Sequence, residues 1–203
     1  MKFYKWKESK ESDKFNTPEH VASMVIEHYL SDAEEGLDVL EPCASGEGGF
    51  EDHPLITRCA GLDYDGRLFQ DCLETPDWII TNPPYSLMGQ FLEHAMMIGT
   101  PNIVFAPVVA NKMWNNAKLW QCAWDYGYGL KEMILLPDCW PNKWTYLLKS
   151  LYFVKDYKGG LNFLDFRGYN RQGNKNRAHI EIPPRHNVQE QFDHKWWYPK
   201  DKK

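Results

Sequence analysis

Short apolar runs alternate with segments of helical periodicity along most of this chain. The apolar runs have the length of buried strands and cover residues 38–41, 57–62, 78–81, 103–109, 131–136 and 149–154. Between them, residues 19–30, 86–98 and 112–126 carry apolar side chains at mostly helical spacing, which predicts helices. Strands that alternate with helices favour a mainly parallel sheet covered by helices on both faces.

The first predicted helix has a start signal in front of its apolar residues. Thr17 is expected at the N-cap, where a hydroxyl accepts a hydrogen bond from a backbone N–H, and Pro18 at the first helical position.

A glycine-rich segment follows the first predicted strand. Residues 38–42 run into Cys-Ala-Ser-Gly-Glu-Gly-Gly-Phe at 43–50. In doubly wound α/β folds such a turn brings the backbone close to a cofactor at the carboxyl end of the first strand, although any tight turn can be rich in glycine. The second predicted strand ends in Asp63, about twenty residues later, where a carboxylate can accept both hydrogens of a ribose diol.

The sequence Asn82-Pro83-Pro84-Tyr85 directly follows the strand at 78–81. The two prolines lack N–H groups and hold φ near −65°, so nearby carbonyls are expected to be available as acceptors. The side-chain carbonyl of Asn82 adds an acceptor, and Tyr85 offers a face for stacking. This combination predicts a socket for a planar amine such as that of adenine, whereas two prolines alone would indicate only a turn that closes a buried strand.

In this order the motifs resemble those of amino-methyltransferases that use S-adenosylmethionine, and in particular the N6-adenine DNA methyltransferases. The resemblance covers residues 15–155 and implies a Rossmann-like fold. It implies a mainly parallel seven-stranded sheet with helices on both faces, in which the last two predicted strands form a C-terminal antiparallel hairpin. Residues 82–85 match the catalytic motif of the family.

The resemblance also implies S-adenosylmethionine as the cofactor, and no metal site is expected. Thr17 and Pro18 match the turn that helps to hold the methionine part, Asp63 matches the ribose acid, and Asp71 the acid that meets the adenine of the cofactor. Gly46 lies five residues after Glu41 where the family has four, so Ser45 reads as an insertion. The cofactor-binding residues implied in this way are Thr17, Pro18, Glu41, Pro42, Ala44, Gly46, Gly48, Phe50, Asp63, Tyr64, Asp71 and Cys72.

The expected reaction is methyl transfer from S-adenosylmethionine to the N6 amine of an adenine in DNA. Acceptors at Asn82 and Pro83 would pull the amine hydrogens out of the ring plane and stabilise the charge that develops on the nitrogen. A paired adenine must first be flipped out of the duplex. In the enzymes that this chain resembles, an aromatic side chain between the last two strands stacks on the second face of the base, and Trp140 and Trp144 fall there.

Charge is distributed unevenly along the chain. The net charge is −5, yet residues 155–203 contain eleven Lys or Arg against six Asp or Glu, which makes that segment +5 and the remainder −10. We therefore expect a catalytic domain at residues 1–156 and a basic appendage at 157–203. Within the appendage Arg171, Lys175 and Arg177 are expected to contact nucleic acid, although a solvated loop has a similar composition.

The distribution of apolar residues and of cysteines bears on where such a protein works. No run of residues has the apolar length of a membrane span, so a soluble, cytoplasmic protein is expected, as a monomer or homodimer. Five scattered cysteines without a Cys-x-x-Cys pair favour reduced thiols. Three alternative functions stay open: adenine methylation in RNA, methylation of a glutamine amide in proteins, and a binding subunit that keeps the fold without catalysis.

Overall fold

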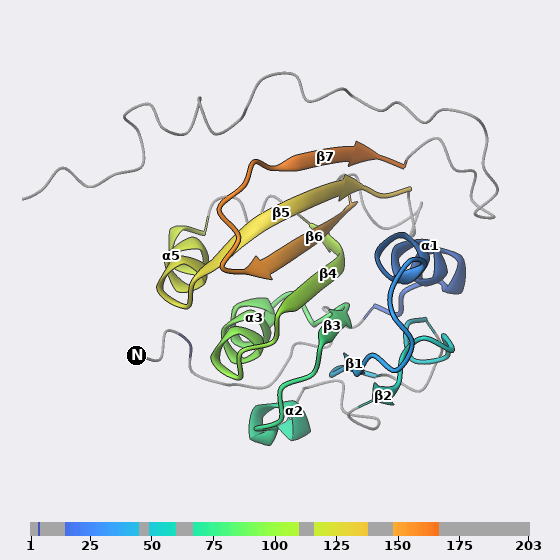
Figure 1. Cartoon of the computed structure of the whole chain (residues 1–203), viewed down its shortest axis with the longest axis horizontal. Helices are drawn as coiled ribbons and strands as arrows, with labels where there is room; N and C mark the ends of the chain where they lie inside the picture. The colour runs from blue at the N-terminus through green and yellow to red at the C-terminus, as the bar shows by residue number, and fades with distance from the viewer. Residues whose placement is uncertain are drawn as a thin grey trace, which may run out of the picture.

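The computed structural model describes residue 4 and residues 15–44, 49–59, 67–109, 116–137 and 148–166. Its elements are drawn in Figure 1. The helices are α1 (Glu19–Leu30), α2 (Arg67–Asp71), α3 (Met88–Met97) and α5 (Ala117–Asp125). The strands are β1 (Val39–Glu41), β2 (Arg58–Cys59), β3 (Trp78–Thr81), β4 (Asn102–Val109), β5 (Tyr128–Leu135), β6 (Leu148–Lys155) and β7 (Asn162–Asp165).

The seven strands form one mixed sheet in the order β2-β1-β3-β4-β6-β5-β7. All neighbouring pairs are parallel except those that involve β6, which runs antiparallel to both β4 and β5. The Rossmann-like methyltransferase architecture expected from the sequence is thereby confirmed, including the antiparallel hairpin, which is formed by β5 and β6.

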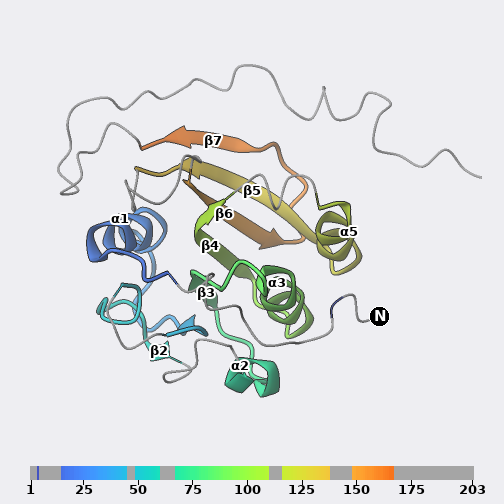
Figure 2. The same cartoon turned by 180° about the vertical axis from the view of Figure 1, so that it is seen from behind.

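Helices cover both faces of this sheet, and the alternation of side chains along β6 shows how. Tyr152 faces α1, where the Tyr29 and Tyr152 rings lie 5.0 Å apart, whereas Phe153 faces α5 and meets the ring of Trp120 at 5.9 Å. Successive residues of a strand point to opposite faces. Helix α3 packs beside α5, and the two views in Figures 1 and 2 place both of them on the opposite side of the sheet from α1.

Helix α1 has the predicted bounds but a different cap. Pro18 occupies the N-cap position with φ −58° and ψ 139°, and its carbonyl accepts from the N–H groups of Val21 and Ala22 at 2.9 and 3.0 Å. Among the described residues, no side chain caps the N-terminus of the helix. The prediction that Thr17 is the N-cap and Pro18 the first helical residue is therefore wrong by one position, and the Thr17 hydroxyl is left for another role.

Strand β7 was not predicted from the sequence. It pairs in parallel with β5 from Glu132–Asn162 to Leu135–Asp165, and the Phe166 N–H then donates to the Leu135 carbonyl at 2.8 Å. Phe166 is buried and meets the His28 ring edge to face at 5.2 Å. The sheet thus continues past residue 156, and Phe166 packs in the core.

Candidate active site

The chain reverses its direction of travel across the sheet between β1 and β3. From β1 it moves outward to β2, then returns to β3 on the other side of β1. In open α/β sheets, ligands bind in the crevice at the carboxyl ends of strands at such a point. Leu40 pairs with Ile79, so Glu41 at the end of β1 lies beside the end of β3, where Thr81 leads into Asn82.

Glu41 is a buried carboxyl group, only 3% exposed. Its Oε1 accepts hydrogen bonds from the Cys43 N–H at 2.8 Å and from the Thr81 hydroxyl at 2.6 Å. Burial raises the pKa of Glu41 to about 8, and the two hydrogen bonds oppose that rise without cancelling it. Near neutral pH the Glu41 carboxyl group at the carboxyl end of β1 is therefore largely protonated.

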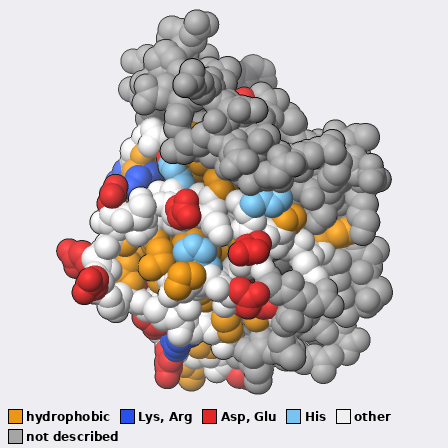
Figure 3. Space-filling model, turned by 90° about the vertical axis from the view of Figure 1, so that its right-hand side faces the viewer, with side chains coloured by type: hydrophobic (Ala, Val, Ile, Leu, Met, Phe, Trp, Pro, Cys, Tyr) orange, Lys and Arg blue, Asp and Glu red, His pale blue; other side chains and the backbone are white. Residues whose placement is uncertain are grey.

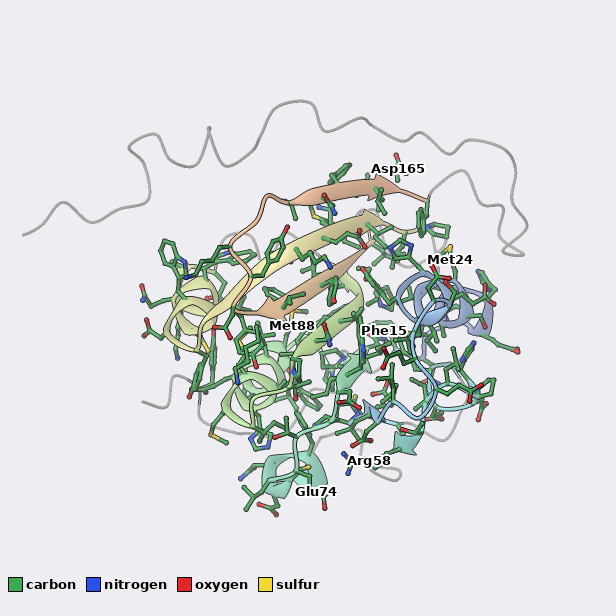
Figure 4. The ribbon with its side chains drawn as sticks, viewed as in Figure 1. Phe15, Met24, Arg58, Glu74, Met88 and Asp165 are labelled. Carbon is green, nitrogen blue, oxygen red and sulfur yellow. The ribbon has the colours of Figure 1, made fainter. Side chains whose placement is uncertain are left out.

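The amide of Asn82 is held in one orientation by the chain in front of α1. Its Nδ2 donates to the backbone carbonyl of Phe15 at 2.7 Å. A carbonyl can only accept, so the amide nitrogen must face Phe15, and Oδ1 is left as the acceptor for a ligand. Figure 4 shows Phe15 between α1 and the ends of the central strands. The predicted backbone acceptor of Asn82 is contacted by the Cys43 thiol at 3.5 Å, a weak donor.

The rest of the catalytic motif is packed into the core. Pro83, Pro84 and Tyr85 are buried, and the Tyr85 hydroxyl donates to the Pro107 carbonyl on β4 at 3.4 Å. The ring centroids of Tyr85 and Phe15 lie 6.3 Å apart at an interplanar angle of 31°. The ring that was predicted to stack on a base is therefore fixed in place, with a second aromatic ring beside it.

Thr17 and the glycine-rich turn meet at the same edge of the sheet. The Thr17 Oγ1 is buried and finds no hydrogen-bond partner among the described residues. Gly49 has φ +94°, and a Cβ on it would lie 2.8 Å from the Thr17 carbonyl. An unpaired buried hydroxyl is costly, so this arrangement fits a site that a polar ligand completes. Pro42, Ala44 and Phe50, three more of the predicted cofactor residues, are also buried.

The close approach of Gly49 to Thr17 gives a testable prediction. Gly49→Ala should destabilise the fold through left-handed backbone strain, about 1–2 kcal/mol, plus about 1–3 kcal/mol from crowding against Thr17. Gly36 is the matched control, because it has φ +86° and a Cβ on it would meet no atom within 4 Å, so Gly36→Ala should show the strain alone. Urea unfolding of both variants measures the difference. Equal losses would contradict a tight contact at Thr17.

Asp71 and Cys72 lie where α2 ends. Asp71 is the exposed last residue of the helix, and the Cys72 carbonyl is hydrogen-bonded by the His94 ring at 2.9 Å. Helix α2 docks on α3 through Phe69, which stacks on Phe91 at 5.5 Å and meets His94 edge to face at 4.7 Å. His94 has a structural role here, since it fixes the segment that contains the predicted adenine-binding acid.

Several predicted site residues lie outside the described residues. They belong to the glycine-rich turn with its extra Ser45, the end of the second strand, the loop between β5 and β6, and the basic appendage. These residues are Gly46, Gly48, Asp63, Tyr64, Trp140, Trp144, Arg171, Lys175 and Arg177. Their roles remain predictions.

The described part of the chain is strongly acidic. It contains seven Lys or Arg against seventeen Asp or Glu, a net charge of −10, so the other segments together carry +5. Figure 3 looks onto the side of the molecule where α1 lies, and on the described part of that face acidic side chains outnumber basic ones. A polyanion that approaches this edge would have to be held mainly by residues outside the described ranges.

Two negative findings concern the described residues. No group of three or more His, Cys, Asp or Glu side chains in those ranges is placed to hold a metal ion. None of the helices in the described part of the chain has both the length and the apolar character that a membrane span requires.

Three residues that shape the site were not among the predicted site residues. Thr81 bonds the buried Glu41, Phe15 holds Asn82 through its backbone, and Gly49 packs on Thr17. Thr81 had a usable signal, because it is a polar residue at the end of an otherwise apolar strand, and Gly49 belongs to the glycine-rich segment at 43–50. A backbone contact such as that of Phe15 has no signature in the sequence.

Comparison with known proteins supports the fold. No protein-family model and no curated protein matches the chain. Among solved structures it is similar to a proposed class I S-adenosylmethionine-dependent methyltransferase from Listeria monocytogenes, with a TM-score of 0.52 and 12% identity over 78% of this chain and 68% of that one. At this identity the similarity establishes the fold alone: the chain has the fold of that methyltransferase.

Two other similarities are weaker. A modification subunit of a proposed type I restriction enzyme from Vibrio vulnificus YJ016 matches with a TM-score of 0.46 and 15% identity, over 76% of this chain and 47% of that one. Magnesium protoporphyrin IX methyltransferase from Synechocystis PCC 6803, solved with bound S-adenosylhomocysteine, matches with a TM-score of 0.45 and 12% identity, over 68% and 82%.

Proposed function

We propose that this protein transfers a methyl group from S-adenosylmethionine to the N6 amine of adenine in DNA. The observation that carries the proposal is the oriented amide of Asn82, which presents Oδ1 at the switch point of a methyltransferase fold. The order of sequence motifs around it supports the same conclusion, because Thr17-Pro18, the glycine-rich turn and residues 82–85 converge on one edge of the sheet.

The residues present fit the cofactor. The unpaired Thr17 hydroxyl offers a polar contact, Gly49 allows the turn to approach closely, and the Glu41 carboxyl closes the end of β1. When bound, S-adenosylmethionine supplies a methyl group on a cationic sulfur. Residues of this chain proposed to hold it are Thr17, Pro18, Glu41, Pro42, Ala44, Gly46, Gly48, Phe50, Asp63, Tyr64, Asp71 and Cys72.

The protein groups around Asn82 would act on the acceptor amine. Asn82 Oδ1 accepts one amine hydrogen and the Pro83 carbonyl the other, which favours a pyramidal nitrogen and stabilises the positive charge that develops on it. Tyr85, fixed by its bond to Pro107, positions the ring of the base. After transfer, a proton leaves the nitrogen for water by way of these acceptors, so no strong general base is needed.

DNA as the substrate rests on the motif order and on the separation of charge. The described residues carry a net negative charge, and the remaining segments, which include Arg171, Lys175 and Arg177, carry a net positive one. We propose that these cations neutralise phosphates while Trp140 or Trp144 stacks on the flipped base.

Radiolabelled S-adenosylmethionine tests the proposal directly. The protein is incubated with duplex DNA, single-stranded DNA, RNA or a protein extract, and an oligodeoxynucleotide without adenine is the matched control. We expect label in adenine-containing DNA, recovered as N6-methyldeoxyadenosine after digestion. Label only in RNA or in protein glutamine would replace the proposed substrate, and no transfer to any of the four would contradict catalysis.

A further inference from the structure

Asn82 touches two parts of the chain that are far apart in sequence. It extends from the rigid end of β3, where Thr81 is fully buried and bonded to Glu41. Across the site, its Nδ2 binds the carbonyl of Phe15, two residues before the unpaired hydroxyl of Thr17. A single amide therefore joins the proposed base socket to the segment at residues 15–18, which is proposed to hold the cofactor.

We propose that Asn82 is a latch that couples cofactor binding to the formation of the base socket. This inference rests on the proposed function and adds a positioning role to Asn82. The two ends of its amide act on different partners: Nδ2 holds the cofactor-binding segment, and Oδ1 faces the substrate amine.

This coupling requires a hydrogen-bond donor on the side chain at position 82, because its partner is the Phe15 carbonyl. A carbonyl oxygen such as that of Phe15 needs an N–H or O–H opposite it. Aspartate has the shape of asparagine but only acceptors when ionised, so at position 82 it would keep the oxygen that faces the amine and set a second oxygen against the Phe15 carbonyl. Asparagine is therefore required here for its nitrogen as well as for its oxygen.

The other contacts of the segment support one arrangement of residues 15–18. The Phe15 ring lies beside Tyr85, and the Thr17 carbonyl lies against Gly49. Pro18 is then the N-cap of α1, of which Val21 and Val25 are fully buried. A ligand that bonds the Thr17 hydroxyl would stabilise this arrangement and the Asn82 orientation with it. By linkage, a substrate held by Asn82 would strengthen cofactor binding by the same factor.

Calorimetric titration with S-adenosylhomocysteine tests the latch without any methyl transfer. This product carries no charge on sulfur, so a new carboxylate at position 82 gains no attraction to the sulfur atom. The variants are Asn82→Ala, which removes donor and acceptor, and Asn82→Asp, which removes only the donor. Asn102→Ala is the matched control, because it also removes an amide whose Nδ2 donates to a backbone carbonyl, that of Asp77 at 3.1 Å, but at the opposite, amino end of the strands.

We expect Asn82→Ala to bind S-adenosylhomocysteine about three- to tenfold more weakly than the parent, the value of one net hydrogen bond. Asn82→Asp should bind more weakly still, and Asn102→Ala like the parent. An isosteric acid that performs worse than alanine is the signature of a missing donor, which a loss of packing would not produce. Thermal unfolding of each variant verifies that the fold is intact.

The outcomes separate this inference from the proposed function. If the parent binds the ligand and both Asn82 variants bind it equally well, the latch is wrong, while the methyltransferase proposal stands. Even by itself, an equal affinity of Asn82→Asp and the parent for S-adenosylhomocysteine would contradict the need for a donor at position 82. If the parent does not bind the ligand at all, the proposed function itself fails.

Discussion

Alanine at Asn82 or at Tyr85 is expected to lower the rate of methyl transfer at least tens-fold. Asn82 supplies the side-chain acceptor that pulls on the amine hydrogen, and removal of one positioned polar group from a catalytic site typically costs about 100- to 1,000-fold. Tyr85→Ala removes the ring that orients the base, a contact worth roughly 1–3 kcal/mol in stacking alone. The measurement is single-turnover transfer with labelled cofactor at a saturating concentration.

Two comparisons separate the loss of the base contacts from a loss of cofactor binding or of the fold. The Asn82→Ala loss in rate should exceed its several-fold loss in cofactor affinity, because the rate also depends on the amine contact. Tyr85→Phe, which keeps the ring and loses only the hydroxyl bond to Pro107, should retain much more activity than Tyr85→Ala. Near-parental turnover of Asn82→Ala or of Tyr85→Ala would contradict the proposed socket.

The second large effect is a dependence of stability on pH that comes from Glu41. Burial raises the pKa of this carboxyl group from 4.5 to about 8 in the folded protein. The folded state therefore keeps a proton that the unfolded chain releases above about pH 4.5. The Glu41 contribution to stability is fully present below pH 4.5, declines as the pH rises towards 8, and is lost above it.

The dependence of the free energy of unfolding on pH can be measured for the parent and for control variants. One proton held only by the folded state corresponds to a loss of about 1.4 kcal/mol per pH unit in the free energy of unfolding. Glu41→Gln keeps the shape of the side chain and an Oε1 acceptor for Cys43 and Thr81 but cannot ionise, so urea unfolding between pH 5 and 8 should show a flatter profile. Glu27→Gln, at an exposed position of α1, should leave the parent profile unchanged. A Glu41→Gln profile as steep as the parent's would show that the slope has another source.

Much of the fold could be predicted because its signals are local. Helix α1 has the bounds that its apolar spacing predicts, and β4 and β6 lie within one residue of the predicted strands. The cap of α1 was misplaced because the sequence does not show that the Thr17 hydroxyl is buried without bonding the helix. Strand β7 was missed because it is short, lies between glycine- and asparagine-rich segments, and depends on pairing with β5 some thirty residues earlier.

Part of the candidate site could likewise be predicted from the sequence, and part could not. Asn82 and Glu41 could be found because their side chains follow strands whose carboxyl ends meet at one edge. The hydrogen bond between Asn82 and the Phe15 carbonyl and the close contact of Gly49 with Thr17 could not be predicted, because both depend on backbone atoms that the tertiary fold brings together.

Strand β7 also determines where the rest of the chain begins. It runs parallel to β5, so Asp165 and Phe166 lie at the carboxyl edge of the sheet, on the side of α1, as Figure 4 shows for Asp165. Arg171 follows Phe166 by only five residues. Under the proposed function, a contact tethered to the folded part of the chain acts at a raised effective concentration, and an individually weak contact then suffices to retain a large ligand. The seventh strand therefore fixes the point from which the chain continues after Phe166, at the same carboxyl edge of the sheet that Asn82 occupies.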